Sequence, residues 1–306
     1  MNTNLNARPD TITVDNVSFS YSEGRNAINR GVTRHDAIDG VSFSAGPGEH
    51  IALVGPNGSG KTTLFQILNG SFCPAKGEVL FDMKNIRAYS VLERAYRIAY
   101  VPQGGRINFP YTCFELVLMG LHPHRTFSAF PGKAFPGNAA LSRAEEIMRE
   151  TGAWRYASKS VNTLSGGELQ LVLLTRSLLQ MFPNSHETRS VPSASEGHVP
   201  KLLLLDEALS ELDISRRIGM MKLLNRILER RPFTIIGIHH DLHLAYRFAN
   251  RIIALHQGSI AGDGKPDEIF TRELFSRVFA VQAEIIPGKG FFFRDDEEKE
   301  EGGGRI

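Results

Sequence analysis

The segment Gly55–Thr63, which reads GPNGSGKTT, constrains the fold more than any other part of the sequence. It follows the apolar run His50–Val54, which predicts a buried strand, and it precedes an apolar helical run that stops at Gly70. This is the pattern G-x-x-x-x-G-K-T in the strand, loop and helix context of a phosphate-binding loop. The alternative is a glycine-rich turn that merely starts a helix.

Each residue type in this loop has a chemical reason to be there. The glycines let the backbone turn its N–H groups inward around phosphate oxygens, and the helix N-terminus adds partial positive charge. Lys61 is expected to reach the β- and γ-phosphates, Thr62 to give its hydroxyl to magnesium, and Thr63 to bond another phosphate oxygen. The predicted phosphate site comprises Gly55, Pro56, Asn57, Gly58, Ser59, Gly60, Lys61, Thr62 and Thr63.

Short apolar runs recur along the chain with helical stretches between them. Strands that are apolar on both faces are typical of a buried parallel sheet, and their alternation with helices indicates an α/β fold. An earlier region, Thr11–Phe19 with Val41–Ser44, alternates apolar and polar residues, which predicts a smaller antiparallel sheet. The predicted parallel strands are His50–Val54, Ile98–Val101, Leu202–Leu205, Thr234–Ile238 and Arg251–Leu255.

Between Gln103 and Leu164 the strand pattern lapses, which predicts a helical subdomain. A helix is expected from Ser142, with Glu145 completing a capping box and Gly152 ending it.

Three polar stretches are expected to lie outside the packed core. Gly24–His35 and Pro183–Pro200 are interpreted as surface excursions, because their composition cannot bury a core. The acidic, glycine-rich end of the chain is expected to be a disordered tail over 289–306, with a binding tail as the alternative.

Composition narrows the class of protein. No apolar run approaches the ~20 residues that cross a bilayer, and the N-terminus lacks a secretory signal, so a cytosolic protein is expected. Cys73 and Cys113 are too few for a disulfide framework or a four-cysteine zinc site. Lys plus Arg number 35 and Asp plus Glu number 33, so no chain-wide basic surface for nucleic acid is indicated.

The leucines of Leu202–Leu205 lead into Asp206 and Glu207. Charges at the carboxyl end of a buried strand lie where α/β sheets bind their ligands. Asp206 is predicted to hold magnesium through water, and Glu207 to orient or deprotonate the attacking water, since phosphoryl transfer needs chiefly positioning and charge neutralisation. The alternative is that both carboxylates only cap the next helix.

A second anion site is predicted at Leu164–Glu168, which reads LSGGE before a long apolar run. Ser165 and Glu168 form a capping box, which by itself explains the segment as a helix start. Gly166 and Gly167, however, expose backbone N–H groups at the positive end of that helix. A nucleotide held by the first loop cannot need both surfaces of one monomer, unless another subunit supplies the second across an interface.

With these three motifs in this order and spacing, the chain resembles the ATP-binding subunit of an ABC transporter from about Thr11 to Gly288. Gly55–Thr63 matches the Walker A loop of that family, Leu202–Glu207 its Walker B strand and Leu164–Glu168 its signature sequence. The resemblance implies hydrolysis of ATP with magnesium on a P-loop NTPase fold, a RecA-like parallel sheet with an antiparallel β subdomain and an inserted helical subdomain. It implies one ABC ATP-binding domain over 1–306, with core 11–103 and 166–262, helical subdomain 104–165 and C-terminal segment 263–288.

The same resemblance gives roles to further positions. Gln103, in YVPQ, matches the glutamine that contacts magnesium and faces the transmembrane partner, and His240 matches the switch histidine that senses the γ-phosphate. Ser210–Asp213 matches the D-loop, which contacts the other ATPase subunit, and Tyr21 matches the aromatic residue that stacks on adenine. The alternatives are that Tyr21 is an ordinary strand residue and that Gln103 is an ordinary polar residue of a loop. A metal site at His240 and its neighbouring histidines is disfavoured, because no cysteine or carboxylate set completes it.

The chain departs from the family pattern at three positions. Ala208 replaces the usual proline after the Walker B glutamate, Glu211 the usual small residue of the D-loop, and Leu171 the usual arginine after Gln170. None of these departures removes a phosphate ligand, but Glu211 adds negative charge near the expected dimer seam.

The segment Glu115–Arg125, ELVLMGLHPHR, resembles subunits that serve importers of ferric siderophores, haem and cobalamin. That resemblance implies a second ATPase subunit in a homodimer, a transmembrane permease, indirectly a substrate-binding protein, and a peripheral place on the cytoplasmic face of the membrane. Nucleic acid is not an expected partner. The alternative function is a soluble ABC ATPase that acts on nucleic acid, ribosomes or cofactor assembly, and the single ATPase unit without a basic arm favours transport.

Overall fold

The computed structural model describes residues 11–21, 36–104, 109–124, 137–183, 200–231 and 233–294. The stretch predicted as a first excursion, 24–35, lies outside the described residues, and so does the second, 183–200, except for its two end residues.

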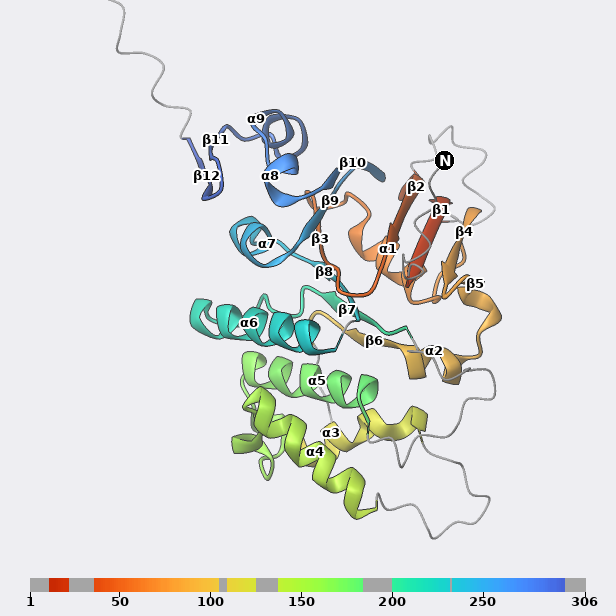
Figure 1. The fold of residues 1–306 in the computed structure, drawn as a ribbon, viewed down its shortest axis with the longest axis vertical. Helices are drawn as coiled ribbons and strands as arrows, with labels where there is room; N and C mark the ends of the chain where they lie inside the picture. The colour runs from red at the N-terminus through yellow and green to blue at the C-terminus, as the bar shows by residue number, and fades with distance from the viewer. Residues whose placement is uncertain are drawn as a thin grey trace, which may run out of the picture.

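A six-stranded sheet forms the centre of the molecule (Figure 1). Its order is β10-β9-β3-β8-β7-β6, with β10 antiparallel at one edge and all other neighbours parallel. The five predicted parallel strands are confirmed, and β7 and β9 each extend one residue further than predicted. The strands are β3 (His50–Val54), β6 (Ile98–Val101), β7 (Leu202–Asp206), β8 (Thr234–Ile238), β9 (Arg251–His256) and β10 (Ser259–Gly264).

The predicted smaller antiparallel sheet is also confirmed, with the order β2-β1-β4-β5. Two of its strands were not predicted from the sequence, because β4 exposes its first three residues and β5 is only two residues long. The strands are β1 (Ile12–Phe19), β2 (Ile38–Ala45), β4 (Lys76–Phe81) and β5 (Lys84–Asn85).

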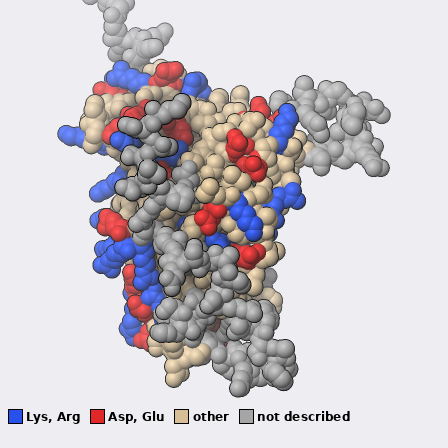
Figure 2. All heavy atoms as spheres, turned by 45° about the vertical axis from the view of Figure 1, so that its right-hand side comes forward, with Lys and Arg blue, Asp and Glu red and all other residues tan. Residues whose placement is uncertain are grey.

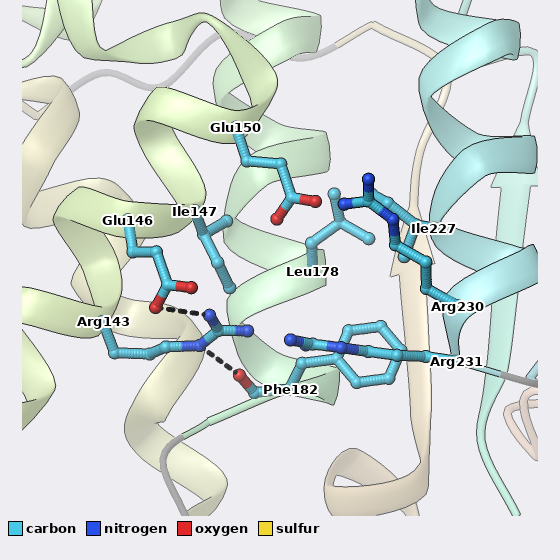
Figure 3. Close-up of a pocket in the computed structure, with 9 residues that line it drawn as sticks. All are labelled: Arg143, Glu146, Ile147, Glu150, Leu178, Phe182, Ile227, Arg230 and Arg231. Atoms are coloured by element: carbon cyan, nitrogen blue, oxygen red, sulfur yellow. Dashed lines mark hydrogen bonds and ion pairs between the residues drawn. The ribbon is translucent and has the colours of Figure 1, made fainter.

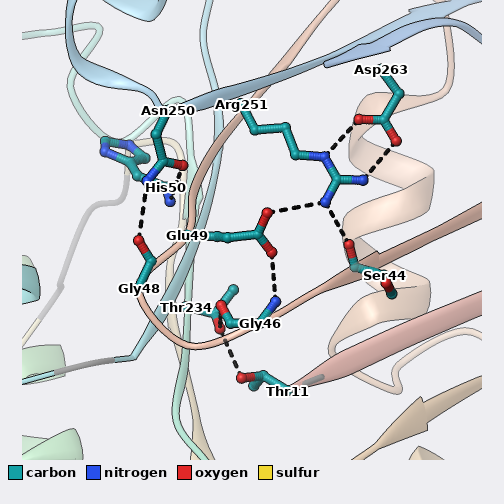
Figure 4. Close-up of polar contacts among 10 residues, drawn as sticks. All are labelled: Thr11, Ser44, Gly46, Gly48, Glu49, His50, Thr234, Asn250, Arg251 and Asp263. Carbon is teal, nitrogen blue, oxygen red and sulfur yellow. Dashed lines mark hydrogen bonds and ion pairs between the residues drawn. The ribbon is translucent and has the colours of Figure 1, made fainter. Parts of the chain in front are cut away.

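Polar contacts tie the two sheets together near the start of β3 (Figure 4). Arg251 of β9 donates to the backbone oxygen of Ser44 at 2.8 Å and to Glu49 at 3.1 Å, and it pairs with Asp263 of β10 at 2.6 Å. The hydroxyl of Thr234 donates to that of Thr11 at 2.9 Å. These bonds fix the approach of the strand that leads into the phosphate-binding loop.

The central sheet is covered by different layers on its two faces. Leu202 and Leu204 pack with helix α1 (Lys61–Leu68) and the antiparallel sheet. Leu203 and Leu205, whose side chains point the other way, pack with α5 (Gly166–Met181) and α6 (Ile214–Arg230). In Figure 1, α1 lies on the side of β1 and β2, whereas α4 and α5 lie below the sheet. The helices after the two predicted anion sites therefore cover opposite faces of one sheet.

Two short helices flank the loop that carries Gln103. Helix α2 (Val91–Arg97) precedes β6 and starts with a capping box of Ser90 and Glu93. Helix α3 (Cys113–Leu118) follows the loop and starts with a capping box of Thr112 and Glu115. Backbone bonds at these caps lower the pKa of Glu93 and of Glu115. Both ends of the loop are thereby anchored to helices.

Helix α4 (Asn138–Thr151) corrects one prediction. Its N-cap is Gly137, so the expected start at Ser142 was wrong and Ser142 lies inside the helix. Helix-favouring alanines before Ser142 extend the helix by one turn. Glu145 does not cap it but pairs with Arg149 at 2.7 Å. The predicted end at Gly152 is confirmed.

Helix α4 packs beside α5. Residues of both helices line a pocket together with residues at the end of α6 (Figure 3). Buried Arg143 of α4 donates to the backbone oxygen of Phe182 at 3.0 Å and pairs with Glu146 at 2.7 Å. From the other side, the guanidinium of Arg231 lies 5.2 Å above the ring of Phe182. This junction attaches the helical region to the sheet-bearing core.

A third apolar cluster gathers α7 (Leu242–Phe248) and the C-terminal elements. The expectation of a disordered tail from residue 289 was wrong at its start, because β12 occupies Gly290–Phe293. Phe291 is buried in this cluster, and its ring stacks on His243 at 4.4 Å, which holds the strand in place. Residues 295–306 lie outside the described residues. The elements here are α8 (Pro266–Ile269), α9 (Arg272–Leu274), β11 (Ala283–Ile286) and β12.

Acidic and basic side chains are interspersed on the face that Figure 2 presents. Within the described part of the chain, no helix combines the length and apolar character needed to cross a membrane.

Candidate active site

The loop Gly55–Thr63 connects β3 to α1 in a conformation that only glycine can supply at two positions. The backbone φ is +151° at Gly55 and +101° at Gly60. A Cβ atom on Gly55 would lie 2.2 Å from the backbone oxygen of Leu255, and one on Gly60 would lie 2.3 Å from that of Ala37. The backbone of the loop thus packs tightly against two other segments of the same chain, those of Leu255 and Ala37. A backbone held in this way suits a cradle for phosphates.

Lys61 is the first residue of α1, and only 6% of it is exposed. Its ammonium donates to the backbone oxygens of Gly55 and Pro56, both at 2.9 Å. Burial lowers the pKa of Lys61, while the carboxylates of Glu207 and Asp206 act in the opposite direction. The lysine charge is therefore held inside the loop and interacts with the two carboxylates at the end of β7, those of Asp206 and Glu207.

Asp206 ends β7 in a buried position. The hydroxyl of Tyr100, on neighbouring β6, donates to its carboxylate at 2.7 Å. Burial raises the pKa of Asp206, and the bond from Tyr100 opposes that rise. Tyr100 lies in a predicted strand, but its role was not predicted, because the sequence does not give the order of strands in the sheet.

Glu207 follows directly, and its backbone has the left-handed φ of +47°. Gln103 donates its amide to one carboxylate oxygen at 2.5 Å, and Nε2 of His240 lies 2.5 Å from the other. These three residues come from the segments after β6, β7 and β8, which end at the same edge of the sheet. The structure thus brings together the three residues expected to act in catalysis.

Tyr21 lies beside α1 with 58% of its surface exposed. Its hydroxyl shares a hydrogen bond of 2.9 Å with that of Thr63. The tyrosine ring contacts Phe19 and Phe72 edge-on, and these two rings stack on each other at 5.1 Å. An exposed aromatic ring is therefore fixed next to helix α1.

The predicted capping box at the start of α5 is confirmed. Ser165 accepts from the backbone of Glu168 at 3.3 Å, and Glu168 accepts from the backbone of Ser165 at 2.9 Å. These bonds lower the pKa of Glu168. Gly166 lies against the carboxylate of Glu211, since a Cβ there would be 2.0 Å from Oε2, and Gly167 faces Leu212 in the same way. The structure therefore joins this anion surface to residues 211–212, on the sheet face opposite α1.

The donor set at the edge of the sheet fits magnesium. Thr62 offers an exposed hydroxyl, Asp206 a carboxylate and Gln103 an amide, and oxygen ligands are those that this hard cation prefers. The raised pKa of Asp206 reflects a buried charge that a cation would stabilise. When bound, the cation would neutralise phosphate charge. Among the described residues, no group of three or more histidines, cysteines, aspartates or glutamates is placed to hold a metal ion.

Comparisons with known proteins find relatives that match most of this chain. A family model described as ABC transporter matches residues 38–183. A hemin import ATP-binding protein of Nitrobacter winogradskyi is 37% identical over 248 residues, which cover 81% of this chain and 84% of that protein. The corresponding protein of Bradyrhizobium diazoefficiens is 35% identical and covers 86% of this chain and 90% of its own length.

Solved structures share the fold. An inward-facing putative metal-chelate type ABC transporter covers 93% of this chain and 96% of its own, with a TM-score of 0.69 and 23% identity. A dimeric bacterial ABC transporter cassette covers 83% of this chain and 98% of its own, with a TM-score of 0.64 and 26% identity.

Proposed function

The chain belongs to the ABC transporter family of ATP-binding proteins, and from that premise we propose that it powers import of haem through a separate membrane permease. As a member of this family, the protein hydrolyses ATP. The working unit in this proposal is a homodimer at the cytoplasmic face of the membrane, which receives its cargo indirectly from a substrate-binding protein.

The proposed catalytic roles rest on one observation: Gln103 and His240 both contact the carboxylate of Glu207. Glu207 positions and polarises the attacking water, and His240 senses the γ-phosphate from the other side of that carboxylate. Lys61 binds the β- and γ-phosphates from within the loop, where its charge already interacts with the carboxylates of Glu207 and Asp206. Asp206, oriented by Tyr100, holds magnesium together with Thr62 and Gln103.

Two observations support the dimer. The loop Gly55–Thr63 and the surface Ser165–Glu168 lead into helices on opposite faces of one sheet, so they suit two different nucleotides. The similar bacterial cassette is described as dimeric. In the proposed arrangement, each ATP is enclosed by the loop of one subunit and by Ser165–Glu168 of the other. Tyr21 then stacks on the adenine of the ATP held in its own subunit.

The choice of haem as cargo follows the relatives. Proteins that match this chain over more than four fifths of its length, at 35% to 38% identity, are named for import of hemin. The cargo crosses the permease and need not touch this chain, so the site residues themselves do not distinguish haem from ferric siderophores or cobalamin.

Uptake by cells that lack this chain tests the proposal. Uptake of labelled haemin, ferrichrome and cyanocobalamin is measured after return of the parent chain, of Glu207→Gln or of Glu229→Gln, which removes an exposed charge on α6. We expect the parent and Glu229→Gln to restore haemin uptake and Glu207→Gln to restore none. If the parent chain restored uptake of ferrichrome or cyanocobalamin instead of haemin, the choice of haem would be contradicted. If it restored uptake of none of the three compounds, the role in transport would be contradicted.

A further inference from the structure

Arg217 lies in the first turn of α6, and its hydrogen bonds go to two loops outside that helix. One nitrogen donates to the backbone oxygens of Ser210 at 3.1 Å and Leu212 at 3.0 Å. Another donates to the carboxylate of Asp241 at 3.2 Å. The guanidinium is largely buried, with 21% of the side chain exposed. One planar group thus bridges the segment 210–212 and the loop between β8 and α7.

The second of these loops carries His240. Asp241 follows His240 directly, accepts from the backbone of Leu244 at 3.1 Å as the N-cap of α7, and binds Arg217 with its other oxygen. His240 in turn lies 2.5 Å from the carboxylate of Glu207. Displacement of Asp241 would therefore move the residue next to it relative to Glu207.

The other loop faces the start of α5. The two oxygens that accept from Arg217 flank Glu211, whose carboxylate lies against Gly166. Leu212 packs against Gly167 in the same way. A continuous line of contacts therefore runs from the N-terminus of α5, through Arg217, to the loop of His240.

We infer that Arg217 is a positioning residue that holds His240 against Glu207 and makes that contact depend on the segment 210–212. The inference rests on the proposed function, in which the start of α5 faces the ATP of the other subunit while Glu207 acts on the ATP of its own. Docking of the second subunit on 210–212 then acts, through Arg217 and Asp241, on the catalytic contact.

The geometry requires an arginine. Three acceptors lie around one planar group with several N–H donors, whereas lysine places a single ammonium and cannot reproduce this fork. Arg217→Met keeps much of the apolar stem and removes every donor. Arg217→Lys keeps the charge and is expected to recover only part of the function.

The test is steady-state ATP hydrolysis with magnesium by the full chain. We expect Arg217→Met to lower kcat about 10- to 100-fold, the scale on which a misplaced catalytic group slows a reaction, while KM for ATP stays within about twofold. The kcat of Arg217→Lys should lie between those of the parent and of Arg217→Met. The matched control is Arg226→Met, because Arg226 is exposed on the same helix α6, away from the segment 210–212.

A second route remains if Arg217→Met folds poorly. Asp241→Asn keeps a side-chain oxygen to cap α7 but weakens the bond to Arg217, so it should lower kcat in the same way, and the double variant should be no slower than the worse single one. Unchanged kcat, equal changes in kcat and KM, or additive effects in the double variant would each overturn the role of Arg217. Absence of hydrolysis in the parent chain would instead contradict the proposed function.

Discussion

The two proposed anion-binding surfaces, the loop Gly55–Thr63 (the loop end) and the start of α5 at Ser165–Glu168 (the helix end), differ in where their functional groups find partners. Around the loop, the functional groups find partners within the chain: Lys61 on loop carbonyls, Asp206 on Tyr100, Glu207 on Gln103 and His240. At Ser165–Glu168 the capping bonds satisfy only the helix start, and the glycines face residues 211–212.

This difference follows from where each end lies in the fold. The groups around the loop come from the ends of parallel strands, which meet at one edge of a sheet. Ser165–Glu168 begins helix α5, which packs on the face of the sheet opposite α1. A change near the loop should therefore alter nucleotide binding or chemistry within one subunit, whereas a change at Ser165–Glu168 should matter only when two subunits meet.

The largest effect is expected from Glu207→Gln. Glutamine keeps the shape of the side chain but cannot accept a proton, so turnover should fall by ~100- to 10,000-fold while ATP and magnesium still bind. The ATP-bound dimer should then accumulate and be visible by size-exclusion chromatography. Asp206→Asn should lose magnesium-dependent binding instead. Near-parental hydrolysis by Glu207→Gln would place the water-activating role on another residue, with His240 the first to test.

Ser165→Arg probes the helix end, and its effect on hydrolysis should be as large. A bulky cation beside Gly166 and Gly167 should prevent the second subunit from closing on ATP, because these glycines leave room only for the backbone. Hydrolysis should fall below detection, while fluorescent ATP binds the monomer with parental affinity. Equal loss of binding and hydrolysis would break the comparison, since it would make Ser165 part of the loop site in its own subunit.

Tyr21→Ala acts at the loop end alone. Loss of one stacking surface costs on the order of 1–3 kcal/mol, by analogy with base-stacking sites for nucleic acid. Tyr21 also bonds Thr63, so Tyr21→Phe separates the two contributions: it keeps the ring and removes only that hydrogen bond. We expect ATP affinity, measured by calorimetry, to fall for alanine and to stay near the parental value for phenylalanine. Parental affinity of the alanine variant would remove Tyr21 from the site.

The loop end could be predicted from sequence because its residues follow recognisable strands. Glu207 and His240 each come after an apolar run, and strand ends meet at one edge in any parallel sheet. The bond from Tyr100 to Asp206 could not be found this way, because it depends on β6 and β7 being neighbours. The bridge made by Arg217 was missed for a similar reason: helix periodicity does not show which loops a helical arginine reaches.

The smallest effect concerns Glu211, which the sequence placed near the dimer seam and which the structure places against Gly166. A carboxylate at a helix N-terminus interacts favourably with the helix dipole, by about 0.3–1 kcal/mol. In the proposed dimer a phosphate of the other subunit's ATP approaches the same helix end, so the two negative charges compete. Glu211→Gln removes the charge and keeps the size of the side chain.

In the Glu207→Gln background, which preserves the ATP-bound dimer, Glu211→Gln should therefore strengthen ATP-dependent dimerisation about two- to fivefold, the range that this dipole energy allows. Sedimentation at several protein concentrations measures the change. Glu229→Gln, an equal loss of charge on the exposed face of α6, is the matched control and should leave the dimer constant unchanged. Weaker dimerisation of Glu211→Gln would mean that the carboxylate binds the second subunit, and Ser165–Glu168 would then resemble the loop end in making a specific polar contact.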